Sequence, residues 1–337
     1  MCIRDSFKGV SNPFAGLALG VLFTVLVQSS STTTAVIVGV VGSGALSVQH
    51  AVPMIMGANI GTTITNTLVS IGSMRRAAEF RRAFAAATVH DFFNLMVVAV
   101  MLPIELVTGV LAGTAGWLSG HLKGGGGAEL SSPIKEAIKD TQKAIAGVFE
   151  GVGLEGTVLD VVTLVLGVGL TFACLHQITG NMRKLMAGRI EAAMNRALQA
   201  SGLIGIGIGV LITVAVQSSS ITTSLLVPMC AAGVMTLENA FPIMLGANIG
   251  TTVTGILASM AEDEQGALTI ALVHVLFNLV GVVFFFPIRV VRLVPLAAAR
   301  GLAEAATRNR LYVLLYVVGT FVVLPLCGWL IWRGEAG

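Results

Sequence analysis

Two short polar motifs stand out in an otherwise apolar sequence. Gln-Ser-Ser-Ser occupies residues 28–31 and again residues 217–220, and threonines follow each copy. Hydroxyl and amide groups both donate and accept hydrogen bonds. Hydroxyl hydrogens, together with the open N–H groups of a helix N-terminus, can bind an oxyanion, whereas hydroxyl and carbonyl oxygens can coordinate a small hard cation. The motifs therefore indicate a site for small ions.

These motifs belong to an internal repeat. Gly-Ala-Asn-Ile-Gly-Thr-Thr at 57–63 recurs at 246–252, with the same offset of 189 residues as the Gln-Ser-Ser-Ser pair. Without gaps, 20 of 43 positions are identical between 28–70 and 217–259. Serine and threonine also pack between membrane helices, which would explain one such cluster. Two copies at one spacing favour a functional role.

The elements that position the motifs must lie in a membrane. Of 337 residues, 55% are hydrophobic and 11% charged, and the mean hydropathy is +0.89. A spanning helix needs about 20 apolar residues, which predicts spans at 52–72, 84–104, 158–180, 267–288 and 311–332. The stretches 13–42 and 202–234 are too long and too interrupted for simple spans. The basic residues lie in short loops, which indicates membrane topology and no nucleic-acid binding.

Arginines predict the orientation of these segments. Loop 75–82 contains four arginines, so it is expected in the cytoplasm, and 181–200 follows it there. The arginines of 289–310 are also cytoplasmic only if 202–234 enters and leaves on one side. We therefore predict an all-α polytopic protein with two inverted-topology repeats, each with a re-entrant helical hairpin that carries Gln-Ser-Ser-Ser.

The chain divides accordingly. Residues 1–8 are expected to be a non-native or disordered leader. Repeat 1 covers 9–110 and repeat 2 covers 158–300. Only repeat 2 has a leading helix, at 158–180, so repeat 1 is expected to lack one. An extracytoplasmic connector with an amphipathic helix at 133–149 fills 111–157, and a membrane helix and tail fill 301–337.

Charge within the motifs indicates ion coupling. Neither motif contains arginine, lysine or a carboxylate, and a bare oxyanion in a low-dielectric site is costly unless cations accompany it. Proton coupling would use an intramembrane carboxylate or histidine, for which His90, Asp91 and His274 are the candidates. We expect both histidines to be structural, and the second copy has Val275 where the first has Asp91. Sodium is favoured, and Glu105 is expected to be interfacial.

The doubled Gln-Ser-Ser-Ser, each followed by Gly-Ala-Asn-Ile-Gly-Thr-Thr, resembles the type II sodium-dependent phosphate cotransporters and their bacterial relatives over about residues 9–295. The resemblance implies a multi-pass transporter of the cell (inner) membrane. It implies import of inorganic phosphate by alternating access, sodium as the coupling ion, no other cofactor and no catalytic residue. It does not fix the oligomeric state, for which a homodimer is one option.

The resemblance assigns phosphate and sodium binding to polar residues of the repeated motifs, without dividing them between the two ions. They are Gln28, Ser29, Ser30, Ser31, Thr33, Thr34, Asn59, Thr62, Thr63, Gln217, Ser218, Ser219, Ser220, Thr222, Thr223, Asn248, Thr251 and Thr252. Three alternatives stay open: a transporter of another small anion, a membrane-embedded enzyme that acts on a lipid phosphate, and a non-transporting sensor or scaffold. The enzyme would need a nucleophile with a positioned base or a carboxylate cluster for a metal.

Overall fold

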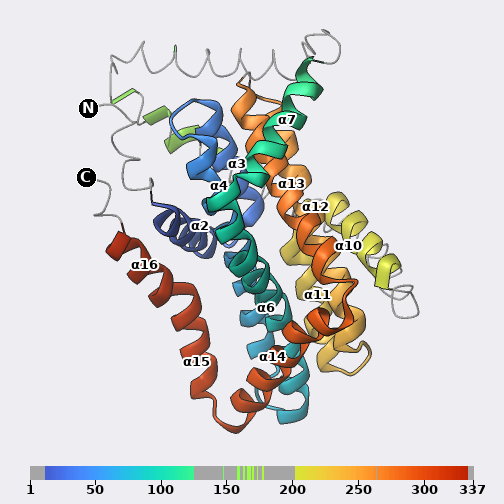
Figure 1. Ribbon diagram of the computed structural model, residues 1–337. Coiled ribbons are helices and arrows are strands. Elements are labelled where there is room, and N and C mark those ends of the chain that lie inside the picture. The colour runs from blue at the N-terminus through green and yellow to red at the C-terminus, as the bar shows by residue number, and fades with distance from the viewer. Residues whose placement is uncertain are drawn as a thin grey trace.

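The computed structural model describes residues 12–124, 202–262 and 264–332, with scattered positions between 147 and 177, and the described segments are helical (Figure 1). The first copy contains α2 (Pro13–Val27), α3 (Ser30–Gly42), α4 (Val48–Gly61), α5 (Ile64–Ile71), α6 (Ala77–Thr108) and α7 (Val110–Gly124). The second contains α10 (Gly202–Val216), α11 (Ser219–Ala231), α12 (Leu237–Ser259), α13 (Gln265–Phe285) and α14 (Arg289–Arg308). The chain then continues through α15 (Leu311–Val318), a π-helical turn η2 (Gly319–Val323) and α16 (Leu324–Trp332).

Some predictions fall on other parts of the chain. The leader 1–8, the helix at 133–149 and the loop 181–200 lie outside the described residues, apart from position 147, and so does most of the span predicted at 158–180.

Four described helices are long and apolar enough to cross a membrane: α6, α12, α13 and the continuous Leu311–Trp332. Three of them contain the spans predicted at 84–104, 267–288 and 311–332. The predicted single span at 52–72 is wrong, because α4 ends at Gly61 and α5 begins at Ile64. Helix α12 was not predicted as a span, since polar residues interrupt its apolar sequence.

The two motif-bearing stretches each form a pair of short helices. Helices α2 and α10 have 15 residues and helices α3 and α11 have 13, so each is shorter than the roughly 20 residues that a span requires. Each pair breaks at the glutamine of its motif. Gln28 and Gln217 have φ of 54° and 56°, and they are the non-glycine residues with positive φ in the described chain. The left-handed conformation ends the first helix of each pair.

Glycines allow each pair to pack closely on the helix that follows it. A Cβ on Gly20 would overlap the carbonyl oxygen of Met54, and a Cβ on Gly209 would overlap that of Ile243. The two contacts are related by the repeat offset, because Gly209 and Ile243 are 189 residues after Gly20 and Met54. Close backbone approach at small residues is the usual means of helix association in lipid.

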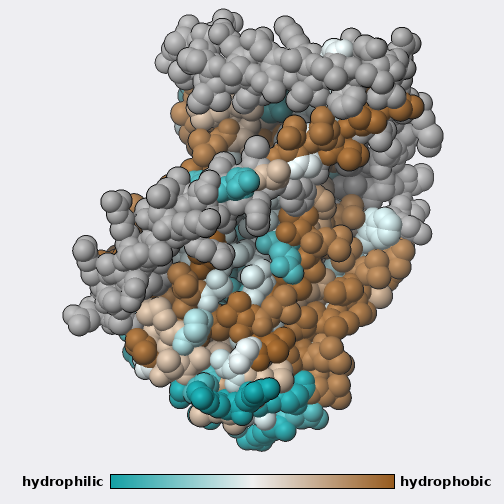
Figure 2. Space-filling view, turned by 180° about the vertical axis from the view of Figure 1, so that it is seen from behind, coloured by the Kyte–Doolittle hydropathy of each residue, from teal (hydrophilic) through white to brown (hydrophobic). Residues whose placement is uncertain are grey.

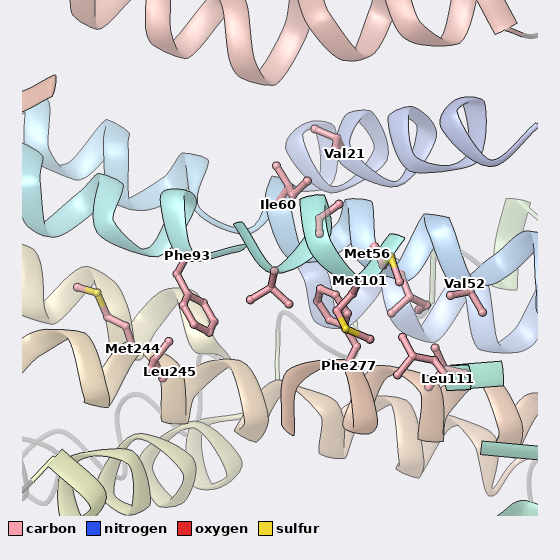
Figure 3. Packing of buried hydrophobic residues seen from close by; sticks show 14 of the residues in the cluster. Val21, Val52, Met56, Ile60, Phe93, Met101, Leu111, Met244, Leu245 and Phe277 are labelled. Carbon is pink, nitrogen blue, oxygen red and sulfur yellow. The ribbon is translucent and has the colours of Figure 1, made fainter. Parts of the chain in front are cut away.

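The two copies share one buried core. Phe93 of α6 packs edge-on against Phe241 of α12, with ring centroids 5.7 Å apart. Figure 3 shows side chains of the same cluster converging from both copies, including Met56 of α4 and Phe277 of α13. The repeats are therefore one packed unit. Figure 2 shows a broad apolar surface above a hydrophilic lower end, as expected for a protein with lipid-facing sides.

Three regions differ from the sequence prediction. Helix α7 forms the start of the predicted connector 111–157, and the amphipathic α14 occupies most of the predicted loop 289–310. Glu105 was expected at the membrane interface, but it is 8% exposed. Its carboxylate accepts hydrogen bonds from the backbone N–H groups of Leu111 at 2.6 Å and Ala112 at 3.0 Å. Glu105 therefore caps the N-terminus of α7, where a negative charge is favourable.

Candidate functional site

The first serine of each motif begins a helix. The Ser29 hydroxyl accepts a hydrogen bond from the backbone N–H of Thr32 at 3.2 Å, and the Ser218 hydroxyl accepts one from that of Ile221 at 3.4 Å. Both serines have extended backbone conformations. These are N-cap interactions, which satisfy one of the open donors in the first turn. Each motif therefore places its remaining serines at a helix N-terminus.

A pair of threonines joins the two helices of each motif. The Thr24 hydroxyl of α2 donates to the Thr33 hydroxyl of α3 at 3.0 Å. The corresponding pair in the second copy, Thr213 and Thr222, is 2.9 Å apart. Thr33 and Thr222 also donate to the carbonyl oxygens of Ser29 and Ser218. These threonines hold the two helices together across the break, so their hydroxyls are engaged within the protein.

The other serines of the motifs keep their hydroxyls free. Among the described residues, none forms a hydrogen bond with the side chains of Ser30, Ser31, Ser219 or Ser220. Ser30, Ser31 and Ser219 are only 5%, 6% and 3% exposed. A buried hydroxyl without a partner loses its hydrogen bond to water without replacement. These side chains are thus available to a ligand at the positive ends of α3 and α11.

The two glutamines differ. Gln28 is exposed. Gln217 is half-buried, and its amide donates to the carbonyl oxygen of Val214 at 2.7 Å and accepts from the Thr254 hydroxyl at 3.1 Å. Thr254 was not predicted as a site residue, although the repeat retains a threonine at the equivalent position 65.

Each motif helix reaches the other copy. The Thr223 hydroxyl of α11 donates to the side-chain carbonyl of Asn66 in α5 at 2.9 Å. In the other direction, the Thr34 methyl of α3 faces Gly255 of α12, where an added Cβ would lie 3.0 Å away. Gly255 aligns with Asn66, so the Thr34 hydroxyl lacks the amide that Thr223 has, and it has no hydrogen-bond partner among the described residues. The sequence could not identify Asn66, because only one copy contains it.

Asparagines connect the copies at a second point. His90 of α6 and the Asn248 side-chain carbonyl of α12 are 2.7 Å apart. The Asn248 amide donates to Asn94 at 2.8 Å, and the Asn94 amide donates to the backbone carbonyl of Asn59 at 2.8 Å. The expectation that Asn59 and Asn248 mark helix breaks is wrong. Both lie inside helices, where their amides satisfy buried polar groups of neighbouring segments.

The threonines of the Gly-Ala-Asn segments serve their own helices. Thr62 and Thr251 donate to the carbonyl oxygens of Ala58 and Ala247 at 2.8 and 3.0 Å. Thr63 and Thr252 donate to the carbonyl oxygens three residues earlier, at 3.0 and 2.7 Å. All four are buried. Their hydroxyl hydrogens are engaged, which leaves their oxygens as possible ligands for a cation.

A buried carboxylate lies beside the break between α4 and α5. Asp91 is fully buried, and one of its oxygens, Oδ2, accepts a hydrogen bond from the Tyr316 hydroxyl at 2.6 Å. The Thr63 hydroxyl faces this carboxylate but donates to Ile60, so Oδ1 has no hydrogen-bond partner among the described residues. A buried anion with one donor requires a cation or a proton. Asp91 was weighed in the sequence only as a proton site, and Tyr316 was missed.

Comparison with known proteins gives a consistent result. A family model described as Na+/Pi-cotransporter matches residues 6–115 and 170–302. Sodium-dependent phosphate transport protein 2A of Ovis aries is 32% identical over 394 residues, which cover 95% of this chain and 62% of the relative. Sodium-dependent phosphate transport protein 2B of Homo sapiens is 32% identical over 404 residues, covering 94% of this chain and 58% of the relative. The chain thus spans about three fifths of the length of these relatives. No solved structure matches it.

Proposed function

Because the chain belongs to the Na+/Pi-cotransporter family, as its repeated motifs predicted, we propose that it is a sodium-coupled secondary transporter that imports inorganic phosphate. The observation that supports this most is the set of free serine hydroxyls at the N-termini of α3 and α11. The relatives are named as sodium-dependent phosphate transport proteins.

Phosphate binds between the two motifs in this proposal. Ser30, Ser31, Ser219 and Ser220 donate their hydroxyl hydrogens to phosphate oxygens, and the open N–H groups of the two helix N-termini donate as well. Each helix N-terminus contributes the equivalent of roughly half a positive charge, and phosphate carries about −1.5 to −2 charges at pH 7. The helix ends therefore leave part of the phosphate charge unbalanced.

Sodium supplies the remaining positive charge. Asp91 is the acidic group closest in character to a cation ligand, because its Oδ1 is buried without a partner. Thr63 faces this carboxylate at the break between α4 and α5 and offers a hydroxyl oxygen. Carboxylate and hydroxyl oxygens are the ligands that hard cations prefer. Sodium coupling therefore accounts both for the uncharged motifs and for the charge of Asp91.

Alternating access is part of the proposal. The short helix pairs α2–α3 and α10–α11 act as re-entrant hairpins of two inverted repeats, 9–110 and 158–300, in the cell membrane. Their equal lengths, their matching breaks at Gln28 and Gln217, and the reciprocal contacts of Thr34 and Thr223 support this arrangement. Loops 75–82 and 181–200 and the region 289–310 are then cytoplasmic.

Uptake into proteoliposomes tests the proposal. An inward sodium gradient should drive accumulation of labelled phosphate, and Ser30→Ala or Ser219→Ala should reduce it at least about tenfold, since each removes a hydrogen bond to a charged ligand. Ser43→Ala is the matched control, because Ser43 ends α3 at an exposed position and donates to Val40. Equal uptake when potassium replaces sodium would refute the coupling.

The transport of another small anion is the main alternative, because a ring of hydroxyls distinguishes oxyanions only loosely. Unlabelled sulfate, arsenate and carboxylates, added in competition with labelled phosphate, separate the two functions. If sulfate or a carboxylate competes better than phosphate, the substrate assignment is wrong.

A further inference from the structure

The longest-range hydrogen bond to the buried carboxylate comes from the last helical segment. Tyr316 lies in α15, 225 residues after Asp91, and its hydroxyl donates to Oδ2 at 2.6 Å. The family model matches the chain only as far as residue 302, so this contact lies beyond the matched region. The second copy has Val275 in place of Asp91, so the interaction is not duplicated.

The Tyr316 ring is fixed by aromatic neighbours. Phe84 and Phe92 of α6 and Phe321 of η2 have ring centroids 6.2, 6.1 and 6.0 Å from that of Tyr316. Phe84 and Phe321 approach the tyrosine ring edge-on. Such contacts restrict the ring independently of its hydroxyl. The hydroxyl is therefore held at a defined position against Asp91.

The two oxygens of Asp91 have different surroundings as a result. Oδ2 is occupied by the tyrosine hydroxyl, and Oδ1 has no partner among the described residues. With Oδ2 engaged, the carboxylate cannot rotate freely, and it offers a single oxygen toward the Thr63 side. Hydrogen bonds to ligating carboxylates orient them and raise metal affinity.

We propose that Tyr316 is a positioning residue that orients Asp91 for a bound sodium ion, an inference that rests on the sodium coupling proposed above. The C-terminal helix Leu311–Trp332 thereby contributes to the ion site without touching the ion. Asp91 supplies the charge, and Tyr316 determines which of its oxygens faces the ion.

The variant that tests this is Tyr316→Phe, which removes the hydroxyl and keeps the ring packed against its three aromatic neighbours. Thermal unfolding of the purified full chain in detergent is followed while sodium chloride replaces potassium chloride at constant ionic strength. The sodium concentration that gives half of the stabilisation should rise about tenfold, as is typical when an outer partner of a metal ligand is lost. Tyr312→Phe, on the same helix but 48% exposed, should match the wild type.

A double-mutant comparison separates positioning from simple packing. In an Asp91→Asn background, Tyr316→Phe should cause no further change in sodium dependence, because there is no charged ligand to orient. Tyr316→Phe that lowers stability without changing the sodium midpoint would assign it a purely structural role and overturn the inference. A sodium midpoint equal to or below that of the wild type would overturn it too. If the wild type itself shows no sodium response in stability or uptake, the proposed coupling fails, and the inference fails with it.

Discussion

A methyl group added to Gly209 should separate α10 from α12. An ideal Cβ there would overlap the carbonyl oxygen of Ile243 and lie 2.9 Å from its carbonyl carbon and 3.0 Å from the backbone nitrogen of Ala247. All these atoms belong to a helix backbone and cannot rotate aside. Carbon contacts are optimal at about 3.5 to 4.0 Å, so the helices must move apart by roughly 0.5 to 1 Å. Overpacking of this kind costs about 1–3 kcal/mol.

Gly207→Ala is the matched control on the same helix. Nothing lies within 4 Å of a Cβ at Gly207, and alanine is favoured over glycine in a helix by about 1 kcal/mol. Gly209→Ala should therefore unfold about 2–4 kcal/mol more easily than Gly207→Ala, as measured by SDS unfolding in mixed micelles with helicity followed by circular dichroism. Equal free energies of unfolding for the two variants would show that the helices are not in backbone contact.

Three further predictions concern buried polar groups, and each is checked by the same unfolding measurement. Glu105→Ala removes the cap of α7 and should cost about 1 kcal/mol, whereas Glu105→Gln, which can still accept a hydrogen bond, should cost less; equal costs would contradict the capping role. Thr223→Val should cost about 1 kcal/mol because it breaks the bond to Asn66, while Thr34→Val should not destabilise the protein; a larger loss at Thr34 would contradict this. Asn248→Ala leaves both His90 and Asn94 without a partner and should cost at least about 1–3 kcal/mol; a neutral effect would mean that the chain of hydrogen bonds is not formed.

The helix pairs could be predicted because the repeat and the arginines constrain them. The repeat placed 28–31 and 217–220 in equivalent positions, and the arginine distribution required that 202–234 not be a simple span. The structure confirms that both stretches are broken, each at its glutamine. The left-handed conformation of Gln28 and Gln217 was not predictable, because glutamine rarely adopts it and only the surrounding packing imposes it.

The break between α4 and α5 shows where local sequence is insufficient. Gly-Ala-Asn-Ile-Gly-Thr-Thr ends a helix in the first copy, after Gly61, and continues through α12 in the second. Identical residues with different structures mean that tertiary contacts decide the outcome. The nearest sequence difference is Asn66, which binds Thr223, against Gly255, which lies close to Thr34. The contact between Asp91 and Tyr316 joins residues too far apart in sequence for any local pattern to reveal it.

The asymmetry between the copies has a consistent chemical meaning. What the copies share are helix N-termini and free serine hydroxyls, which suit an anion. What they do not share are the break at Thr62–Thr63, the carboxylate of Asp91 and its tyrosine partner, and these suit a cation. A duplicated site thus donates to phosphate from two sides, while a single charged group lies beside one of them. Loss of the Asp91 charge should therefore weaken sodium dependence more than it weakens phosphate binding at saturating sodium, whereas loss of Ser30 or Ser219 should do the opposite.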